Sequence, residues 1–176
     1  MTRSQLEHLI SASGTIADDD DIIVIGSQSI LGQFPCAPSE LLVSQDADVY
    51  PRMYPERAEL IDGSIGAGSP FERTYGYYAH GVGPETAVLP KGWEERLVLV
   101  SSQNTRFVRG WCLEAHDLAI AKLVAGREKD LDFVEALQRH EMVMGEILKE
   151  RLGATEVLPP VRSLVAARIV RLFGQH

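Results

Sequence analysis

The segment 21–50 constrains the fold most, because a buried strand, a tight turn and a pair of acids follow one another closely. Its first part, DIIVIGS, is a β-branched run that ends in Gly26-Ser27. Such a run is typical of a strand covered on both faces. The later run LLVSQDADVY alternates, which places Asp46 and Asp48 on one face of a second strand. Between the two strands, QSILGQF is predicted as a short helix and PCAPSE as a loop.

The rest of the chain divides into a mixed part and a helical part. Further strands are predicted over 73–82 and 96–102, with GAGSP as a flexible exit from a helix and PETAVLPKGW as an irregular connection. Helical periodicity is predicted over residues 3–12, 55–65, 116–126, 131–140, 142–152 and 161–173. We therefore expect an α+β protein with a C-terminal helical block.

Charge and hydropathy exclude several classes of function. The net charge of −8 argues against general DNA binding, and most of the acidic excess lies in residues 1–110. No apolar run approaches the ~20 residues that a membrane span needs, and the first residues lack the apolar core of a signal peptide. Cys36 and Cys112 fit neither a zinc motif nor a disulfide framework. A cytoplasmic protein without membrane partners is expected.

The acids and the turn each have a functional and a plain interpretation. Carboxylates two residues apart on a strand lie about 7 Å apart at their Cα atoms, so their oxygens can converge on Mg²⁺ or Mn²⁺. The alternative is a pair of solvated aspartates near a strand end. Gly26 permits close backbone approach to a ligand, and Ser27 at a helix start can meet phosphate. The alternative is a turn in which Ser27 only caps the helix.

Gly26-Ser27 followed by Asp46-x-Asp48 resembles the nucleotidyltransferase superfamily of the polymerase-β type. The resemblance implies a small mixed β-sheet flanked by helices in residues 1–112, with residues 113–176 forming a helical region packed on this core. It also implies that Ser27 contacts the phosphates of an NTP and that Asp46 and Asp48 bind the metal.

A lone lysine interrupts the apolar helix LAIAKLVA. The ammonium group of Lys122 either snorkels to water at the edge of the helix or points toward an anion. Arg127, Lys129 and Asp130 follow closely, after Gly126, which is expected to bend or end the helix. The plain interpretation of this cluster is a solvated turn in which Asp130 caps the next helix.

The segment HDLAIAKLVAGREKDLDFV is similar to one in the AbiEii-like branch of the superfamily, which includes toxins of bacterial toxin–antitoxin systems. Lys122, Arg127, Lys129 and Asp130 match that branch in kind and order. The resemblance covers about residues 20–140 and implies that the basic residues contact the nucleotide. It also implies a cognate antitoxin as a possible partner.

The sequence departs from the family at the expected third carboxylate. That position should fall near YYAHGV, where the chain has His80, with Glu72 before it and Glu85 after it. His80 or Glu85 is the candidate catalytic base, and the alternative for His80 is a surface or core-edge histidine. We expect a metal-dependent nucleotidyltransferase acting on RNA, such as a tRNA end, or on protein. The alternative is an inactive member of the family that binds nucleotide or regulates a partner.

Overall fold

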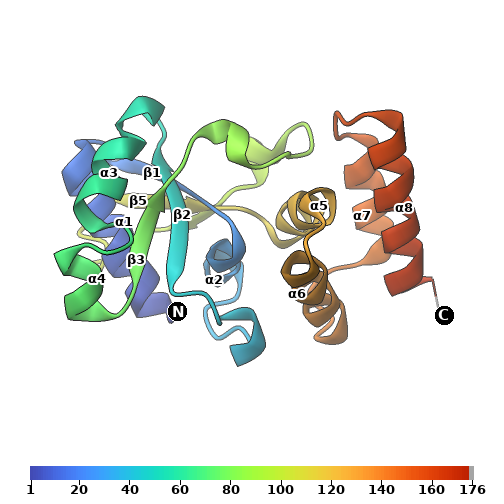
Figure 1. Ribbon diagram of the computed structural model, residues 1–176, viewed down its shortest axis with the longest axis horizontal. Coiled ribbons are helices and arrows are strands. Elements are labelled where there is room, and N and C mark those ends of the chain that lie inside the picture. Colours follow the sequence, from blue (N-terminus) through green and yellow to red (C-terminus); the bar gives the residue numbers. More distant parts are fainter. Residues whose placement is uncertain (175–176) are drawn as a thin grey trace. The chain divides into compact units, whose positions relative to one another are not determined.

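The computed structural model describes residues 1–174, which form two compact units (Figure 1). Unit 1 comprises Met1–Thr86 and Leu97–Leu113. Unit 2 comprises Ala87–Arg96 and the chain from Glu114 onward. The chain therefore passes from one unit to the other three times. Among residues 1–174, every helix is too short or too polar to cross a bilayer.

A five-stranded mixed sheet organises unit 1, in the order β3-β2-β1-β5-β4. The central strand β1 pairs antiparallel with β2 and parallel with β5. Strand β2 pairs parallel with β3, and β4 pairs antiparallel with β5. The strands are β1 Asp21–Ile25, β2 Asp46–Pro51, β3 Tyr78–Gly81, β4 Val98–Val100 and β5 Arg109–Cys112. The mixed sheet and its flanking helices confirm the α+β prediction.

Helices cover one face of this sheet. The helices of unit 1 are α1 (Arg3–Ala17), α2 (Ile30–Gln33), α3 (Ala58–Ile65) and α4 (Pro70–Tyr75), and Figure 1 shows α1, α3 and α4 on the same side. Gly110 on β5 abuts Ile10 of α1, and Gly81 on β3 abuts the backbone of α3 at Ala58. Through the strand register, both glycines share a face with Val49. The helices thus bury Val49, and Asp48 belongs to the opposite face.

Unit 2 is helical apart from its first segment. Its helices are α5 (Ala115–Ala125), α6 (Glu128–Arg139), α7 (Gly145–Gly153) and α8 (Pro159–Phe173), and a 3-10 turn spans Trp93–Arg96. Gly126 has φ +66° and ends α5, as its position in the sequence predicts. The helical block predicted for the C-terminal part of the chain is confirmed.

A buried ion cluster attaches the segment Ala87–Arg96 to the helices of unit 2. Asp117 on α5 is fully buried and accepts hydrogen bonds from Arg96 at 2.7 and 3.0 Å. Arg151 on α7 lies 3.2 Å from the same carboxylate. The two arginines therefore offset the cost of burying the carboxylate of Asp117. Through these ion pairs the segment Ala87–Arg96 is attached to α5 and α7.

Two elements differ from the sequence prediction. The strand predicted over 73–82 is wrong in its first half, because Pro70–Tyr75 forms helix α4 and β3 begins only at Tyr78. Ser69 caps α4 by accepting a hydrogen bond from the backbone of Glu72, with Pro70 in the first turn. Strand β5 was not predicted at all, although it pairs with the central strand.

Candidate functional site

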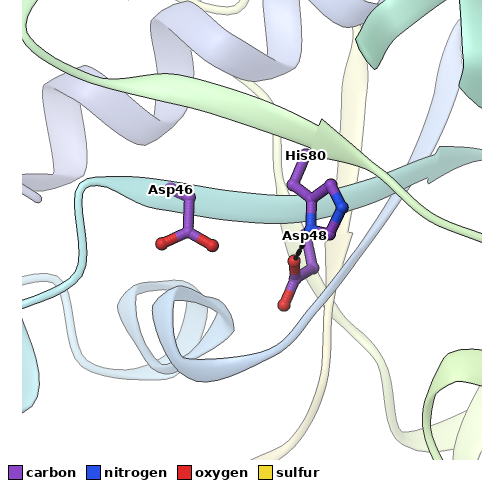
Figure 2. Close-up of side chains that lie close together, drawn as sticks. All are labelled: Asp46, Asp48 and His80. Carbon is purple, nitrogen blue, oxygen red and sulfur yellow. Dashed lines mark hydrogen bonds and ion pairs between the residues drawn. The ribbon is translucent and has the colours of Figure 1, made fainter. Parts of the chain in front are cut away.

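Two acids project from β2 toward the same side. In the alternating burial of this strand, Ala47 and Val49 are buried while Asp46 and Asp48 are partly accessible. Figure 2 shows the two carboxylates below the strand, on one side of it. The hydroxyl of Ser44, just before the strand, donates a hydrogen bond to Asp46. This contact orients one acid, and the sequence analysis did not identify it.

His80 joins these acids from the neighbouring strand. In the parallel pairing of β2 with β3, His80 lies opposite Asp48. Its Nδ1 atom lies 3.0 Å from Oδ1 of Asp48, and a dashed line marks this contact in Figure 2. Candidate ligand atoms of Asp46, Asp48 and His80 all lie within 4.8 Å of one another. We call these three residues the acid–histidine cluster, and their spacing suits a divalent cation.

The Gly26 turn borders the acid–histidine cluster. Gly26 follows β1, whose last residue Ile25 lies opposite Asp48. It has φ +75°, and an added Cβ atom would overlap the Asp48 carboxylate. The carbonyl of Gly26 accepts hydrogen bonds from the backbone of Ser29 at 3.2 Å and from its hydroxyl at 2.7 Å. Glycine is therefore required here both for its conformation and for space.

The predicted helix start at Ser27 is a short turn. Ser27–Ser29 forms a 3-10 helix, and the following helix α2 has four residues. A helix this short has only a small dipole, so its effect on phosphate is limited to local backbone N–H groups. Ser27 directly follows Gly26, which abuts the carboxylate of Asp48.

Tyr78 shares the face of the acids and was not identified from the sequence. It lies opposite Asp46 in the pairing of β2 with β3. Burial raises the pKa of its phenol, and the negative charges of Asp46 and neighbouring acids raise it further. Tyr78 is therefore a neutral phenol at physiological pH, which can donate a hydrogen bond beside the acids.

The structure does not bring Glu85 into the acid–histidine cluster. Glu85 lies in a 3-10 turn after β3 and is exposed, with its carboxylate folded against Gly83. With Glu56 and Glu59 it lines a separate pocket of about 420 Å³. Glu72 accepts a hydrogen bond from the backbone of Gly68 in the first turn of α4. A catalytic role for Glu85 stays a prediction.

Two of the predicted basic residues, Lys122 and Arg127, form a cluster in unit 2 with Asp130. This carboxylate is fully buried and lies 3.1 Å from Nζ of Lys122 and 2.6 Å from Nε of Arg127. Burial alone would raise the pKa of Asp130, but the hydrogen bonds from Arg127 and Lys122 hold it below its usual value. Lys129 is exposed at the start of α6. Phosphate contacts by these residues stay predictions.

The structure corrects the capping role predicted for Asp130 and decides between the two alternatives for Lys122. Arg127, and not Asp130, occupies the N-cap position of α6, and Asp130 lies in the first turn. Of the two alternatives for Lys122, the structure shows the one that points toward an anion, since its side chain is 12% exposed and pairs with Asp130. Its ammonium group also lies 5.6 Å from the centre of the Phe133 ring.

Comparisons with known proteins give one match. Residues 4–168 match a family model described as "Nucleotidyltransferase of unknown function (DUF6036)". Neither the curated proteins nor the solved structures contain a match to the chain. The matched range includes the acid–histidine cluster, the Gly26 turn and the Asp130 ion pairs.

Proposed function

Because the chain belongs to a family of nucleotidyltransferases of unknown function, we propose that it transfers a nucleotidyl group from an NTP to an acceptor hydroxyl on RNA or protein. The reaction is proposed to depend on a divalent cation, Mg²⁺ or Mn²⁺. One observation carries the proposal: Asp46 and Asp48 present their carboxylates together, directly against the Gly26 turn. This arrangement combines cation ligands with a backbone that a phosphate can approach closely.

The donor set of the acid–histidine cluster fits a divalent cation. Two carboxylates and an imidazole lie within 4.8 Å of one another, and the hydrogen bond from Ser44 keeps one of the acids in place. Asp46 and Asp48 would hold the ion. When bound, the ion neutralises phosphate charge and stabilises the in-line displacement. The residues of β2 and β3 supply a rigid frame for these ligands, because both strands are part of the paired sheet.

The proposed reaction exchanges one bond at the α-phosphorus for another. The oxygen of the acceptor hydroxyl forms a bond to this phosphorus, the bond to the β-phosphate oxygen breaks, and pyrophosphate leaves. The hydroxyl proton needs a base. His80 and Glu85 are the candidates from the sequence, and His80 is the one that lies beside Asp48.

Phosphate binding is proposed for two groups of residues. Gly26 and Ser27 belong to the turn that abuts Asp48, and we propose that their backbone N–H groups and the Ser27 hydroxyl contact phosphate. Lys122, Arg127 and Lys129 supply positive charge, and the buried Asp130 orients the first two through its hydrogen bonds. The proposed role of these basic residues rests on their order in the sequence and, for Lys122 and Arg127, on their shared counter-ion.

The finer assignment follows the AbiEii-like resemblance. We propose that the protein acts as the toxin of a toxin–antitoxin pair and that its cognate antitoxin is a protein or RNA encoded beside it. The support is the order of Lys122, Arg127, Lys129 and Asp130 in the sequence. Expression from an inducible promoter tests this role: growth should stop, and Asp46→Asn with Asp48→Asn should restore it.

A second candidate function is supported by the composition of the acid–histidine cluster. Among residues 1–174 this cluster has His80 where nucleotidyltransferases of the polymerase-β type carry a third carboxylate. A site of two aspartates and one histidine is expected in a protein that binds a metal–nucleotide complex without transferring the nucleotidyl group. Such a protein would regulate a partner through its nucleotide-bound state.

One experiment separates the two candidates. The protein is incubated with each labelled NTP, Mg²⁺ or Mn²⁺, and total RNA or cell lysate, with an Asp46→Asn, Asp48→Asn variant as the control. Metal-dependent label in RNA or protein, lost in the variant, supports transfer. Calorimetric binding of an NTP without transfer supports the second candidate. Absence of binding at millimolar NTP contradicts both.

A further inference from the structure

We propose that His80 is a direct metal ligand rather than the catalytic base, so that the acid–histidine cluster forms a mixed nitrogen–oxygen site that prefers Mn²⁺ to Mg²⁺. The inference deepens the proposed function and rests on its assignment of Asp46 and Asp48 as metal ligands. It adds His80 as a third ligand, which gives a role to the residue that departs from the family pattern. It also names Mn²⁺ as the preferred metal.

The distances within the cluster match the coordination shell of one ion. In an octahedral site with ligand bonds of about 2.1 Å, adjacent ligand atoms lie about 3 Å apart and opposite ones about 4.2 Å apart. Nδ1 of His80 and Oδ1 of Asp48 are separated by 3.0 Å. The third ligand atom, from Asp46, lies within 4.8 Å of both. Small side-chain rotations therefore suffice to bring all three to one ion.

Each ligand is held in place from a different direction. The Gly26 turn confines the carboxylate of Asp48, and Ser44 donates a hydrogen bond to Asp46. The backbone of Gly81, next to His80, donates a hydrogen bond to Asp62 on α3 at 3.2 Å. This contact anchors the end of β3 on which His80 sits. Both acids and the strand that carries His80 are thus positioned before an ion binds, which lowers the entropic cost of binding.

The chemistry of the donors decides the choice of metal. Mg²⁺ is a hard cation that prefers oxygen ligands, whereas imidazole nitrogen suits first-row transition metals. Two carboxylates and one neutral imidazole also neutralise a divalent ion without excess negative charge. Mn²⁺ combines tolerance of nitrogen ligands with an octahedral shell that accepts phosphate oxygens.

The ligand role and the base role compete for the same side chain. If Nδ1 binds the ion, the imidazole proton resides on Nε2, and neither ring nitrogen has a lone pair left to accept the proton of the acceptor hydroxyl. The hydrogen bond between His80 and Asp48 in the metal-free protein is then replaced by an ion that both residues share. The two roles therefore differ in a property that spectroscopy measures directly.

Pulsed electron paramagnetic resonance of the full chain with Mn²⁺ alone, without nucleotide, tests the proposal. Nitrogen bound to Mn²⁺ produces a characteristic modulation of the electron spin echo. We expect this modulation in the wild type and in His140→Gln. This variant is the matched control because His140 is an exposed histidine at the C-terminal end of α6. We expect its loss in His80→Gln, together with Mn²⁺ binding that is weaker by at least about tenfold.

Competition between metals provides a second measurement. In the wild type, Mg²⁺ should displace Mn²⁺ poorly, and His80→Asp should reduce the preference for Mn²⁺ over Mg²⁺ by at least about tenfold, because it restores an all-oxygen site. Circular dichroism checks that each variant is folded. Bound Mn²⁺ without nitrogen modulation in the wild type overturns the proposal, as does modulation that persists in His80→Gln.

The outcome is distinguishable from failure of the proposed function. Metal binding is measured here without NTP or acceptor, so loss of transfer activity does not affect it. A positive nitrogen signal with no nucleotide transfer would support the metal site and the non-catalytic candidate together. If Asp46→Asn with Asp48→Asn leaves Mn²⁺ binding unchanged, the ion is bound elsewhere and the ligand role of His80 is wrong.

Discussion

Gly26 lies against the carboxylate of Asp48 so closely that no side chain fits between them. An ideal Cβ atom on Gly26 would overlap Oδ2 of Asp48, and the backbone at this position has φ +75°. The turn that ends the central strand therefore determines where one of the two acids can lie. This contact connects two sequence motifs that are separated by a loop.

Replacement of Gly26 by alanine should disrupt the metal site. The new methyl group would displace the carboxylate of Asp48, and the backbone conformation, φ +75° and ψ −176°, is open essentially only to glycine, so it would add a strain of about 1–3 kcal/mol. We expect loss of most divalent-metal affinity, measured by calorimetry. Gly68→Ala is the matched control, since Gly68 has φ +77° with nothing within 4 Å of an added Cβ. Equal metal affinity in both variants would contradict the prediction.

Replacement of Asp130 by asparagine should destabilise unit 2 in a pH-dependent manner. At neutral pH it leaves Lys122 and Arg127 without their shared counter-ion, and removing one partner of a buried ion pair costs about 3–5 kcal/mol. The pKa of Asp130 lies below its ordinary value of 3.8 in the folded protein. Its contribution is therefore fully present above pH 3.8 and is lost as the pH falls through the lower, folded pKa.

Urea unfolding at pH 7 and at pH 3 checks this expectation. The difference in unfolding free energy between the wild type and Asp130→Asn should be smaller at pH 3, where protonation begins to remove the same charge from the wild type. Asp132→Asn serves as the control because Asp132 is exposed on the same helix. A constant difference across this pH range would show that the ion pairs do not stabilise the fold.

Replacement of Asp117 by asparagine should release the segment Ala87–Arg96. The carboxylate is fully buried between Arg96 and Arg151, so its removal leaves two cations in a poorly hydrated position. We expect faster amide hydrogen exchange over Ala87–Arg96 and the start of α5. Exchange in β1 and β2 should stay close to that of the wild type. Unchanged exchange at Arg96 would contradict the anchoring role of Asp117.

The positively charged residues near Asp130 should affect nucleotide binding more than metal binding. We expect Arg127→Gln and Lys129→Gln to weaken NTP affinity by about tenfold each, since a charge-assisted contact to phosphate contributes about 1.5 kcal/mol or more. Mn²⁺ affinity without nucleotide should be unchanged. Lys149→Gln, at an exposed lysine of α7, is the control. NTP affinity equal to that of the control would remove these residues from the proposed site.

The two cysteines should differ in reactivity. Burial raises the pKa of the Cys112 thiol to about 12, so at pH 8 it is protonated and inaccessible. Cys36 is exposed in the loop before β2. Mass spectrometry after treatment with iodoacetamide should show one modification in the folded protein, at Cys36, and two after denaturation. Rapid modification of Cys112 without denaturant would mean that β5 detaches from the sheet.

Local signals predicted the strands and turns around Asp46 and Asp48 well. The β-branched run before Gly26 and the alternation around Asp46 and Asp48 each report on residues that are near neighbours in the chain. Helices of unit 2 were predicted for the same reason, because their apolar periodicity is long. In these places a local pattern determines the local structure.

The remaining parts depend on pairing between distant segments. Strand β5 is only four residues long and contains Arg109 and Gly110, so its own composition does not indicate a strand next to the sheet centre. His80 reaches Asp48 through the parallel register of β2 and β3, which no local pattern specifies. Helix α4 did have a local signal, since Ser69 and Glu72 form a capping pattern around Pro70, but the glycines before it favoured a loop.

The passage of residues 87–96 through unit 2 limits how this protein can be divided. A fragment that begins at Glu114 would contain Asp117 and Arg151 but not Arg96, which supplies the bidentate pair to this buried anion. Removing everything after Leu113 would conversely leave residues 87–96, which belong to unit 2, without the helices they contact. A gene fusion or split reporter that separates the two units should therefore join Thr86 to Leu97 with a short linker. Residues 87–96 should be fused to the chain that begins at Glu114.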